Sequence, residues 1–384
     1  MKPRKAKQGA KKCGKCGASD WDRSGRCREC RRIRQRSWGA RKRLERRLAR
    51  ETWAPHADAD RIAAGMLPRG TSTLRNAAGE VVLQWQKTER DPTMARQAVL
   101  DAFADVAAKI PAARRAKPPK TADRDTCCVY PMGDPHLGMR AWSEETGDRD
   151  YDLTIARAEL YAAADTLCSI APPSRTAIVI PLGDTVHGDD STNKTRRSGH
   201  VLDVDGRYAK VARLAVDTMI RIIDRALLKH ERVLFKAVTG NHDDETSLWI
   251  ALCVQQRYRL DPRVYVDTRP NRFWYFRFGR TLLGATHGDT VKRSGPSLAE
   301  IMAHDRPHAW AEARHRYWYV GHVHHRSVHE RPGVLIETFR TMAARDAYAA
   351  SHGYRSGQDM QMIVLHREHG EINRHRVGIG RIGG

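Results

Sequence analysis

From residue 126 onward, short apolar runs alternate with longer segments that carry apolar side chains at helical spacing. The short runs are rich in β-branched and aromatic residues, which predicts strands at 127–132, 176–182, 232–238, 263–266, 273–278, 281–286, 317–320, 334–338 and 361–366. Helices are predicted at 151–170, 207–230 and 247–260, where the apolar positions recur every three or four residues. This alternation predicts an α/β domain.

The residues before this domain have a different pattern. Segment 74–87 alternates apolar and polar positions around Asn76–Gly79, which predicts a hairpin, and a helix is predicted to begin at Asp91. A proline- and lysine-rich segment then predicts a linker. The predicted organisation is a basic zinc-ribbon-like module with an Arg-rich helix, a hairpin-plus-helix arm, a linker and the main domain, at 1–50, 51–110, 111–125 and 126–384.

Positive charge is concentrated at the N-terminus. The chain has 384 residues and a formal net charge of +23. Residues 1–50 hold 20 Lys and Arg against 4 Asp and Glu, while the other 334 residues hold 48 against 41. Such a module would be attracted to a polyanion, and nucleic acid, DNA in particular, is the expected partner. The alternative is a solubilising or localisation tail.

Four cysteines lie within the basic module as two Cys-x-x-Cys pairs, Cys13 with Cys16 and Cys27 with Cys30. Two such pairs can surround one ion tetrahedrally, which predicts a structural zinc site. Two disulfides or reactive thiols are the alternative. The following segment, 31–50, is strongly basic with a thin apolar stripe, as in a helix that lies on phosphate or in solvent.

The chain has no apolar run of about 18 residues and no apolar segment of a secretory signal after its basic start. We therefore expect a cytoplasmic protein without a membrane partner.

Polar loops follow the predicted strands and offer carboxylate, amide and imidazole groups. They are Gly133-Asp134-Pro135-His136, Gly183-Asp184, Gly240-Asn241-His242-Asp243, His287-Gly288-Asp289 and Gly321-His322-Val323-His324. Ligands of α/β sheets usually bind beyond the ends of strands. These donor types suit a pair of divalent ions, which can activate water and compensate charge on a phosphoryl group.

The five loops, in this order, resemble the signature blocks of the calcineurin-like metallophosphoesterase superfamily over residues 126–370. The resemblance implies a sandwich of two β-sheets flanked by helices. It also implies a first metal held by Asp134, His136, Asp184 and His324, and a second held by Asp184, Asn241, His287 and His322. His242 would protonate the leaving oxygen or stabilise the transition state, oriented by Asp243.

One block departs from the pattern of many phosphatases in this superfamily, because no Arg-Gly pair follows Asp184. His187 instead resembles a position of SbcD-type nucleases that helps substrate to enter. The adjacent loop contains Asn193, Arg196 and Arg197, which we expect to contact substrate, with a solvated insertion as the alternative. The overall layout also resembles metallophosphoesterases of phages and prophages, which implies hydrolase chemistry and a bacterial host but leaves the substrate open.

These features predict a dinuclear metal-dependent phosphodiesterase, with DNA nuclease as the favoured activity. Manganese is the expected metal, and iron or zinc would also suit the donors. A phosphomonoesterase is the first alternative. The second is a nucleic-acid-binding recruitment protein with a secondary phosphoesterase site.

Overall fold

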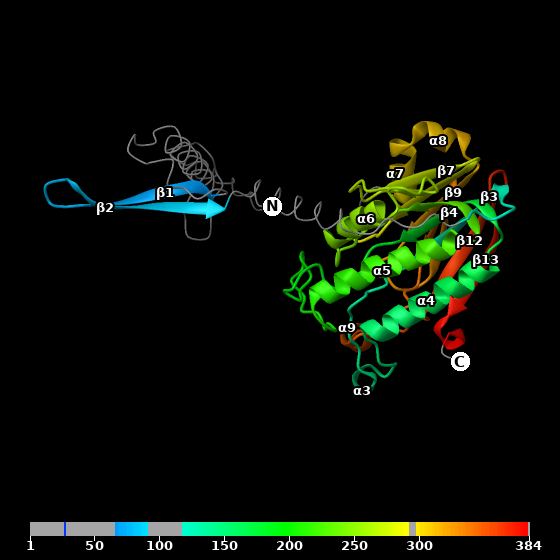
Figure 1. The fold of residues 1–384 in the computed structure, drawn as a ribbon, viewed down its shortest axis with the longest axis horizontal. Helices are drawn as coiled ribbons and strands as arrows, with labels where there is room; N and C mark the ends of the chain where they lie inside the picture. Colours follow the sequence, from blue (N-terminus) through cyan, green and yellow to red (C-terminus); the bar gives the residue numbers. More distant parts are fainter. Residues whose placement is uncertain (1–26, 28–65, 91–116, 292–296, 383–384) are drawn as a thin grey trace, which may run out of the picture. The chain divides into compact units, whose positions relative to one another are not determined.

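The computed structural model describes residues 27, 66–90, 117–291 and 297–382 (Figure 1). The chain divides into two compact units, Met1–Phe103 and Ala104–Gly384. Apart from Cys27, the predicted zinc module lies outside the described residues, as do the helices predicted at 31–50 and after Asp91. The zinc site therefore stays a prediction.

The described part of the first unit is an antiparallel hairpin of β1 (Met66–Arg75) and β2 (Val81–Arg90). Its turn is fixed by Asn76, whose Oδ1 accepts hydrogen bonds from the backbone N–H groups of Ala78 and Glu80 at 3.0 and 2.9 Å. Gly79 adopts a φ of 82° there. The predicted hairpin is confirmed, and its strands extend beyond 74–87.

The second unit contains two sheets, as expected for the predicted class. The six-stranded sheet runs in the order β13 (Gly370–Gly378), β12 (Asp359–His366), β3 (Asp123–Met132), β4 (Ser174–Pro181), β5 (His230–Phe235) and β6 (Val264–Val266). The five-stranded sheet runs in the order β10 (Ser327–Arg331), β11 (Val334–Thr338), β9 (His315–Val320), β8 (Thr281–Thr286) and β7 (Trp274–Phe278). Neighbouring strands from β3 to β6 are parallel, and so are β8, β9 and β11.

Helices cover the outer face of each sheet (Figure 1). The six-stranded sheet packs against α4 (Leu153–Ile170), α5 (Tyr208–Ala226) and α6 (Thr246–Arg257). The five-stranded sheet packs against α7 (Leu298–Asp305) and α8 (Pro307–Glu312). Short segments α3 (Ser143–Thr146), α9 (Ala347–Ser351) and η2 (Ile379–Arg381) complete the described elements. The result is the predicted sandwich of two sheets flanked by helices.

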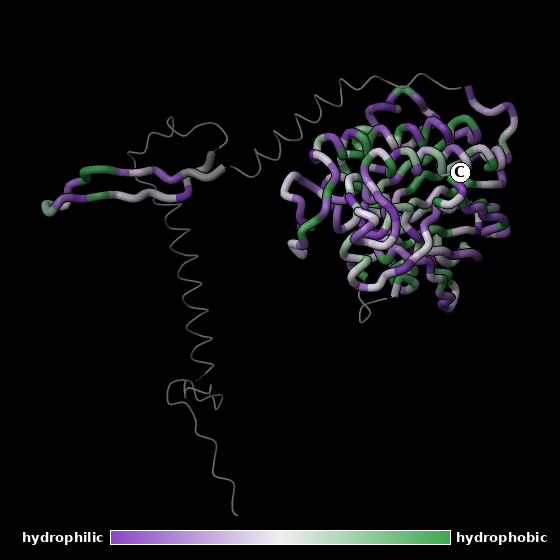
Figure 2. The backbone as a smooth tube through the Cα atoms, turned by 90° about the horizontal axis from the view of Figure 1, so that it is seen from below, coloured by the Kyte–Doolittle hydropathy of each residue, from purple (hydrophilic) through white to green (hydrophobic). Residues whose placement is uncertain are grey.

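Successive side chains of the central strands point to opposite faces of the sheet and pack into two separate hydrophobic cores. On β3, Cys128 and Tyr130 pack against the helices, while Cys127 and Val129 pack between the sheets. Both faces of this strand are therefore buried, which explains why it reads as a continuous apolar run. Figure 2 shows hydrophobic stretches interspersed with hydrophilic ones along the backbone of this unit.

Several predicted boundaries were wrong. The helix predicted to reach His230 ends at Ala226, and His230 instead begins β5. Apolar residues continue through Leu227 and Leu228 without Gly or Pro, so the pattern gave no stop signal. The last residues of the predicted linker, from Asp123, belong to β3.

His230, the first residue of β5, is fully buried and has a hydrogen-bond partner at each ring nitrogen. Ser174 Oγ bonds the carbonyl of Thr176 and lies 2.7 Å from His230 Nδ1, while Tyr130 Oη lies 2.7 Å from His230 Nε2. The hydroxyl proton of Ser174 is used by the carbonyl, so the ring donates from Nδ1 and accepts at Nε2. This arrangement holds the neutral imidazole.

We expect His230 to make the fold sensitive to acid. Burial lowers the pKa of His230 from 6.5 to about 4. Because the pKa is depressed in the folded state, the unfolded chain binds the proton first as the pH falls. The contribution of His230 to the free energy of unfolding is therefore fully present above pH 6.5 and is lost as the pH falls toward 4. The free energy of unfolding should fall by about 3 kcal/mol across this window through His230 alone.

The measurement compares denaturant unfolding of the wild type and His230→Gln between pH 7.5 and 4. The difference in unfolding free energy between the two proteins should shrink as the pH falls, because the variant has no imidazole to protonate. If the difference in unfolding free energy between the wild type and His230→Gln did not change with pH, the assignment of His230 as a buried neutral imidazole would be contradicted.

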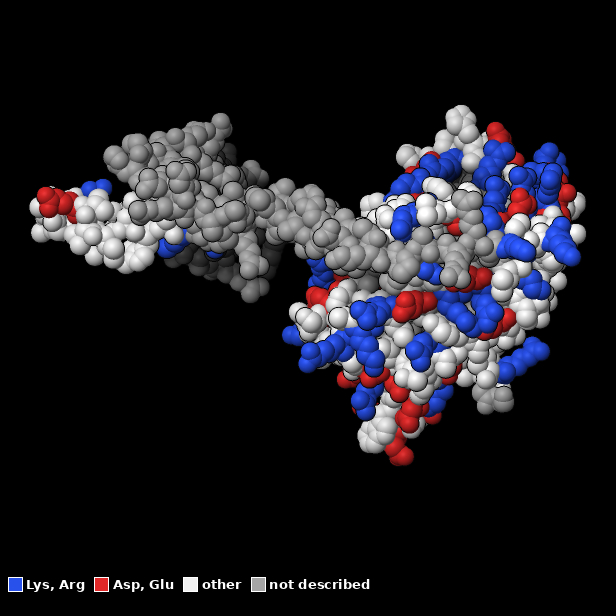
Figure 3. All heavy atoms as spheres, in the orientation of Figure 1, with Lys and Arg blue, Asp and Glu red and all other residues white. Residues whose placement is uncertain are grey.

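No described helix is long and apolar enough to cross a membrane. On the face shown in Figure 3, Lys and Arg are intermixed with Asp and Glu across the second unit.

Candidate metal centre

Each candidate donor lies just beyond the C-terminal end of a strand. Asp134 and His136 follow β3, Asp184 follows β4, and Asn241 follows β5. His287 follows β8, and the last two donors, His322 and His324, follow β9. Since β3, β4 and β5 are parallel, and β8 and β9 are parallel in the other sheet, the ends of both sheets bring these loops together.

The backbone of these loops is strained. Six described residues other than glycine have a positive φ, and five of them are predicted metal ligands: Asp134, His136, Asp184, His322 and His324. This conformation is costly for residues with a Cβ and persists where the surrounding structure enforces it, often at functional sites. The sixth is Asn193.

One group of donors comprises Asp134, His136 and His324, whose ligand atoms lie within 4.8 Å of one another. The Nε2 atoms of His136 and His324 are 3.0 Å apart, and His324 Nε2 is 3.9 Å from Asp134 Oδ1. The carboxylate of Asp134 is fully buried and accepts the backbone N–H of His322 at 2.9 Å. Thr341 Oγ1 holds the same loop by donating to the Asp134 carbonyl.

A second group comprises Asp184, His287 and His322, again within 4.8 Å. His287 Nδ1 donates to the Leu182 carbonyl at 2.9 Å, so its Nε2 is directed toward the donors. That Nε2 lies 3.2 Å from Asp184 Oδ2 and 2.9 Å from Asn241 Oδ1. The structure therefore brings all seven predicted ligands together.

Asp184 connects the two groups. Its Oδ2 lies 4.0 Å from His136 Nε2 in the first group and 3.2 Å from His287 Nε2 in the second. Its Oδ1 accepts the backbone N–H of His242 at 2.8 Å, which fixes the carboxylate. Asp184 is thus the carboxylate that lies within reach of a histidine in each group.

The structure corrects the expected role of Asp243. Its fully buried carboxylate accepts backbone N–H groups from Gly240, Asp184 and Thr185 at 2.8, 3.1 and 2.7 Å. It therefore ties the loop after β4 to the loop after β5 and does not orient the imidazole of His242. Sequence spacing placed these residues side by side but could not show which way the carboxylate points.

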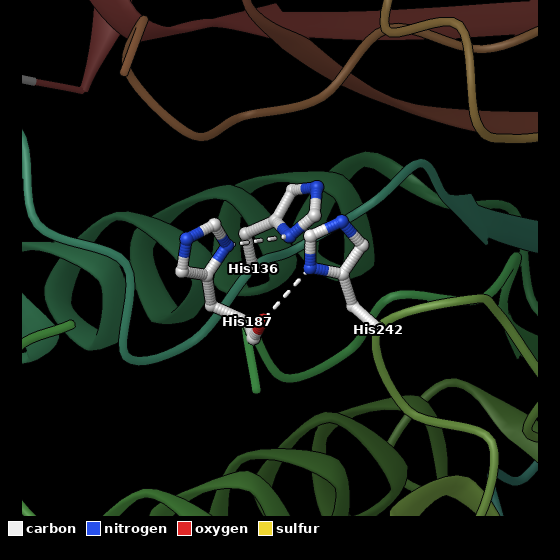
Figure 4. Close-up of side chains that lie close together, drawn as sticks. All are labelled: His136, His187 and His242. Atoms are coloured by element: carbon white, nitrogen blue, oxygen red, sulfur yellow. Dashed lines mark hydrogen bonds between the residues drawn. The ribbon is translucent and has the colours of Figure 1, made fainter. Parts of the chain in front are cut away.

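The imidazole of His242 is oriented by His187 instead. His242 Nδ1 lies 2.8 Å from the carbonyl oxygen of His187, and the two rings stack with centroids 5.2 Å apart (Figure 4). His187 is buried, and its Nδ1 lies 3.2 Å from Nδ1 of His136. These three histidines form a cluster beside the two donor groups.

The electrostatics of the site favour neutral imidazoles at several positions. Burial lowers the pKa of His187 to about 3 and that of His324 to about 4, and it also lowers the pKa of His136. Burial alone would lower the pKa of His287, but the carboxylates of Asp184 and Asp134 raise it above its usual range. A proton on His287 therefore offsets part of the buried negative charge.

Burial and the neighbouring histidines also shift the pKa values of the Asp134 and Asp184 carboxylates. Burial raises the pKa of Asp134. Burial alone would raise the pKa of Asp184 as well, but His287 outweighs it and lowers that pKa. Among the described residues, only histidines form ion pairs with these two carboxylates, and no Lys or Arg does. Neutral imidazoles around two buried carboxylates fit divalent cations, which would compensate this charge more fully than one proton.

The residues predicted to contact substrate lie in ion pairs at the edge of the site. Arg196 pairs with Glu245 at 2.7 Å, and Arg197 pairs with Asp289 at 2.9 Å and with Asp244 at 3.2 Å. Asn193 accepts the backbone N–H of Leu202 through its own carbonyl. These contacts join the loop 191–207 to the segments that follow Asp243 and His287.

Sequence reasoning missed Arg272 at this edge. Arg272 pairs with Asp289 at 3.1 Å and also contacts Asp244, so it completes a ring of two arginines and two aspartates with Arg197. Nothing in its local sequence distinguishes Arg272 from other arginines. The available signal was the pair of aspartates, Asp244 and Asp289, that follow the Asn241–Asp243 and His287-Gly288 segments.

A methyl group at Gly240 is expected to damage the site. A Cβ there would lie 2.0 Å from Asp184 Oδ1 and 2.3 Å from its backbone nitrogen. Gly240→Ala must therefore displace the carboxylate that joins the donor groups, and metal affinity should fall by about 10- to 100-fold. Calorimetric titration with Mn²⁺ would measure this loss.

Gly188→Ala provides the matched control. The nearest atom to a Cβ at Gly188 is 3.7 Å away, an ordinary contact, although this residue follows His187 directly. Its metal affinity should stay at the wild-type value. Equal affinities for the two variants would show that the close approach of Gly240 to Asp184 does not support the site.

No family model and no curated protein matches the sequence. Among solved structures, the chain is similar to an archaeal phosphodiesterase at 10% sequence identity and a TM-score of 0.33. The match covers 66% of this chain and 99% of the phosphodiesterase. A predicted phosphoesterase from Streptococcus pneumoniae matches with 10% identity, 66% and 98% coverage and a TM-score of 0.28. Vps29 from Entamoeba histolytica, solved with Zn²⁺, matches with 11% identity, 65% and 98% coverage and a TM-score of 0.25.

Proposed function

We propose that the protein is a dinuclear metal-dependent phosphodiesterase that cleaves nucleic acid, with DNA as the favoured substrate. The observation that supports this most directly is the position of Asp184 between two donor groups. A carboxylate shared by two cations is the arrangement that two-metal phosphoryl hydrolysis uses to activate the nucleophile and to compensate charge on the non-bridging oxygens.

Two ions would be held by the residues of the two groups. Asp134, His136 and His324 would bind the first, His287, His322 and Asn241 the second, and Asp184 both. Mn²⁺ is the favoured ion, and Fe²⁺ or Zn²⁺ also suits a mixed imidazole and carboxylate set. When bound, such ions supply a nucleophile at neutral pH and offset charge on the phosphoryl oxygens.

The protein's own residues supply orientation and a proton. His242 is held through Nδ1 by the His187 carbonyl, so its Nε2 is free to face the substrate. In the imidazolium form, in which both ring nitrogens carry protons, the proton on Nε2 would pass to the leaving oxygen, which would otherwise depart as an unfavourable alkoxide, and His242 would be left as the neutral imidazole. Asp243 holds the backbone of this loop and of the Asp184 loop in register.

Nucleic acid is the favoured substrate because the basic charge of the chain is concentrated in residues 1–50. Neutralisation of phosphates by Lys and Arg would hold a polyanion near the hydrolytic domain. A monoesterase for small substrates has no need of such a module. The zinc-ribbon-like arrangement of the four cysteines is consistent with this binding role.

A substrate panel tests the proposal. The full chain with Mn²⁺ would be offered single- and double-stranded DNA, RNA, bis(4-nitrophenyl) phosphate and 4-nitrophenyl phosphate. We expect cleavage of DNA and of the generic diester, with far slower turnover of the monoester. Turnover of the monoester alone would favour a phosphomonoesterase, and DNA binding without any hydrolysis would favour a recruitment protein.

A further inference from the structure

We propose that His187 positions the first metal ion and the proton-donating histidine together. Its side chain fixes the ring orientation of His136, and its backbone carbonyl fixes that of His242. This inference rests on the proposed metal-dependent function, and it replaces the expectation that His187 serves substrate entry.

The loops after β3 and β4 run side by side and bring the two rings together. His136 N–H donates to the Asp184 carbonyl at 2.9 Å, and Leu137 N–H donates to the Thr185 carbonyl at 3.0 Å. His187 N–H then donates to the Leu137 carbonyl at 2.9 Å. This parallel pairing places the backbone of His187 beside that of Leu137, next to His136, and the Nδ1 atoms of the two histidines then lie 3.2 Å apart.

Ligand geometry determines the direction of the hydrogen bond between these rings. His136 Nε2 lies 3.0 Å from His324 Nε2 and faces Asp184, so it is the nitrogen directed at the first donor group. An ion at Nε2 needs the lone pair there, which places the proton of His136 on Nδ1. His136 Nδ1 therefore donates to His187 Nδ1, and His187 carries its own proton on Nε2.

The comparison with His287 shows why this partner matters. His287 uses Nδ1 to donate to a backbone carbonyl, that of Leu182, and so presents Nε2 to the second group. His136 has the same requirement but meets the ring of His187 instead of a carbonyl. The first group is thus oriented by a side chain that a single substitution can remove.

The same residue orients the proton donor. The His187 carbonyl accepts from His242 Nδ1 at 2.8 Å, and the two rings stack at an interplanar angle of 21°. In Figure 4 the Nε2 atoms of His136 and His242 lie on the same side of the cluster, and Nε2 of His187 points away from them. His187 therefore sets the spacing between the first ion and the leaving-group histidine.

These contacts also argue against a separate ion among the three histidines. They lie close enough to share one. However, Nδ1 of His242 is bonded to a carbonyl, and Nδ1 of His187 is bonded to His136. Nδ1 of His242 carries the proton that it donates to this carbonyl, and the lone pair of His187 Nδ1 accepts the proton of His136, so neither nitrogen has a lone pair left for an ion.

Three substitutions separate the positioning role from other roles. His187→Asn places an amide oxygen where Nδ1 lay, His187→Gln places it nearer the position of Nε2, and His187→Ala removes the acceptor. Titration with Mn²⁺ in a calorimeter should show binding weakened by about 10- to 100-fold in His187→Ala and His187→Gln, with most of the affinity restored in His187→Asn. His325→Ala, an exposed histidine of a neighbouring loop, should bind as the wild type does.

Hydrolysis provides a second readout. If His187 acts through the metal, raising the Mn²⁺ concentration should restore most of the diesterase rate of His187→Ala. A residue that contacts substrate directly would leave a defect at saturating Mn²⁺. That result would overturn the proposal in favour of substrate entry.

A spectroscopic measurement tests the tautomers without activity. Long-range ¹H–¹⁵N correlation spectra of the Zn²⁺-loaded protein should show His187 protonated on Nε2 and His136 protonated on Nδ1. Protonation of His187 on Nδ1, or equal Mn²⁺ affinity in the alanine and asparagine variants of a folded protein, would overturn the assignment. The affinity measurement remains informative even if no substrate is hydrolysed, so failure of the proposed function and of this inference can be distinguished.

Discussion

Replacement of Asp184 by asparagine is expected to lower diesterase activity by about 10³-fold, because the variant loses the charge that both ions share. The buried carboxylate lies between His136 and His287, one from each donor group. Asparagine can still accept the backbone N–H of His242, so the fold should survive. Metal content by mass spectrometry and diesterase rate would be measured on the same preparation, and both should fall.

Asp190→Asn is the control for this substitution. Asp190 is exposed in the same loop and bonds only to Thr192 among the described residues. The variant has the same change of charge but should keep its ions and its rate. If Asp184→Asn retained two ions and wild-type activity, the shared carboxylate would have no role in catalysis.

Replacement of His242 by alanine is expected to slow cleavage of DNA by about 10²- to 10⁴-fold while metal binding is retained. The imidazole is held by the His187 carbonyl and belongs to neither donor group that contains Asp184 or Asp134. The loss should depend on the leaving group. An alkoxide needs the proton that His242 supplies, whereas 4-nitrophenolate leaves readily without it.

The measurement compares a DNA oligonucleotide with bis(4-nitrophenyl) phosphate in the wild type and in His242→Ala, both saturated with Mn²⁺. The variant should lose much more activity on DNA than on the nitrophenyl diester. Equal losses on both substrates would contradict proton donation and would indicate that His242 acts on the phosphoryl group itself.

The donors themselves could be predicted because each follows an apolar run that forms a buried strand. Asp134, Asp184 and His287 were placed at strand ends by this pattern alone. The positive φ of Asp134 and Asp184 could not be predicted, since a strained conformation of a non-glycine residue leaves no mark on composition. The contacts of Asp243 and Arg272 could not be predicted from the sequence because they join segments that lie far apart in the chain.

Two strands, β10 and β13, were not predicted from the sequence, and their position in the sheets explains why. β10 and β13 lie at the edges of their sheets and carry charged residues such as Glu330, Arg331, Arg374 and Arg376. Edge strands are commonly polar and present no apolar run. In contrast, β8 and β11 are internal, and their bounds match the predicted ones.

The most direct test of the dinuclear assignment is diffraction from crystals grown with Mn²⁺, with anomalous maps to locate the ions. Two anomalous peaks are expected. One would be bound by Asp134, His136 and His324, the other by Asn241, His287 and His322, with Asp184 touching both. Absence of bound ions, or a single ion among His136, His187 and His242, would contradict it.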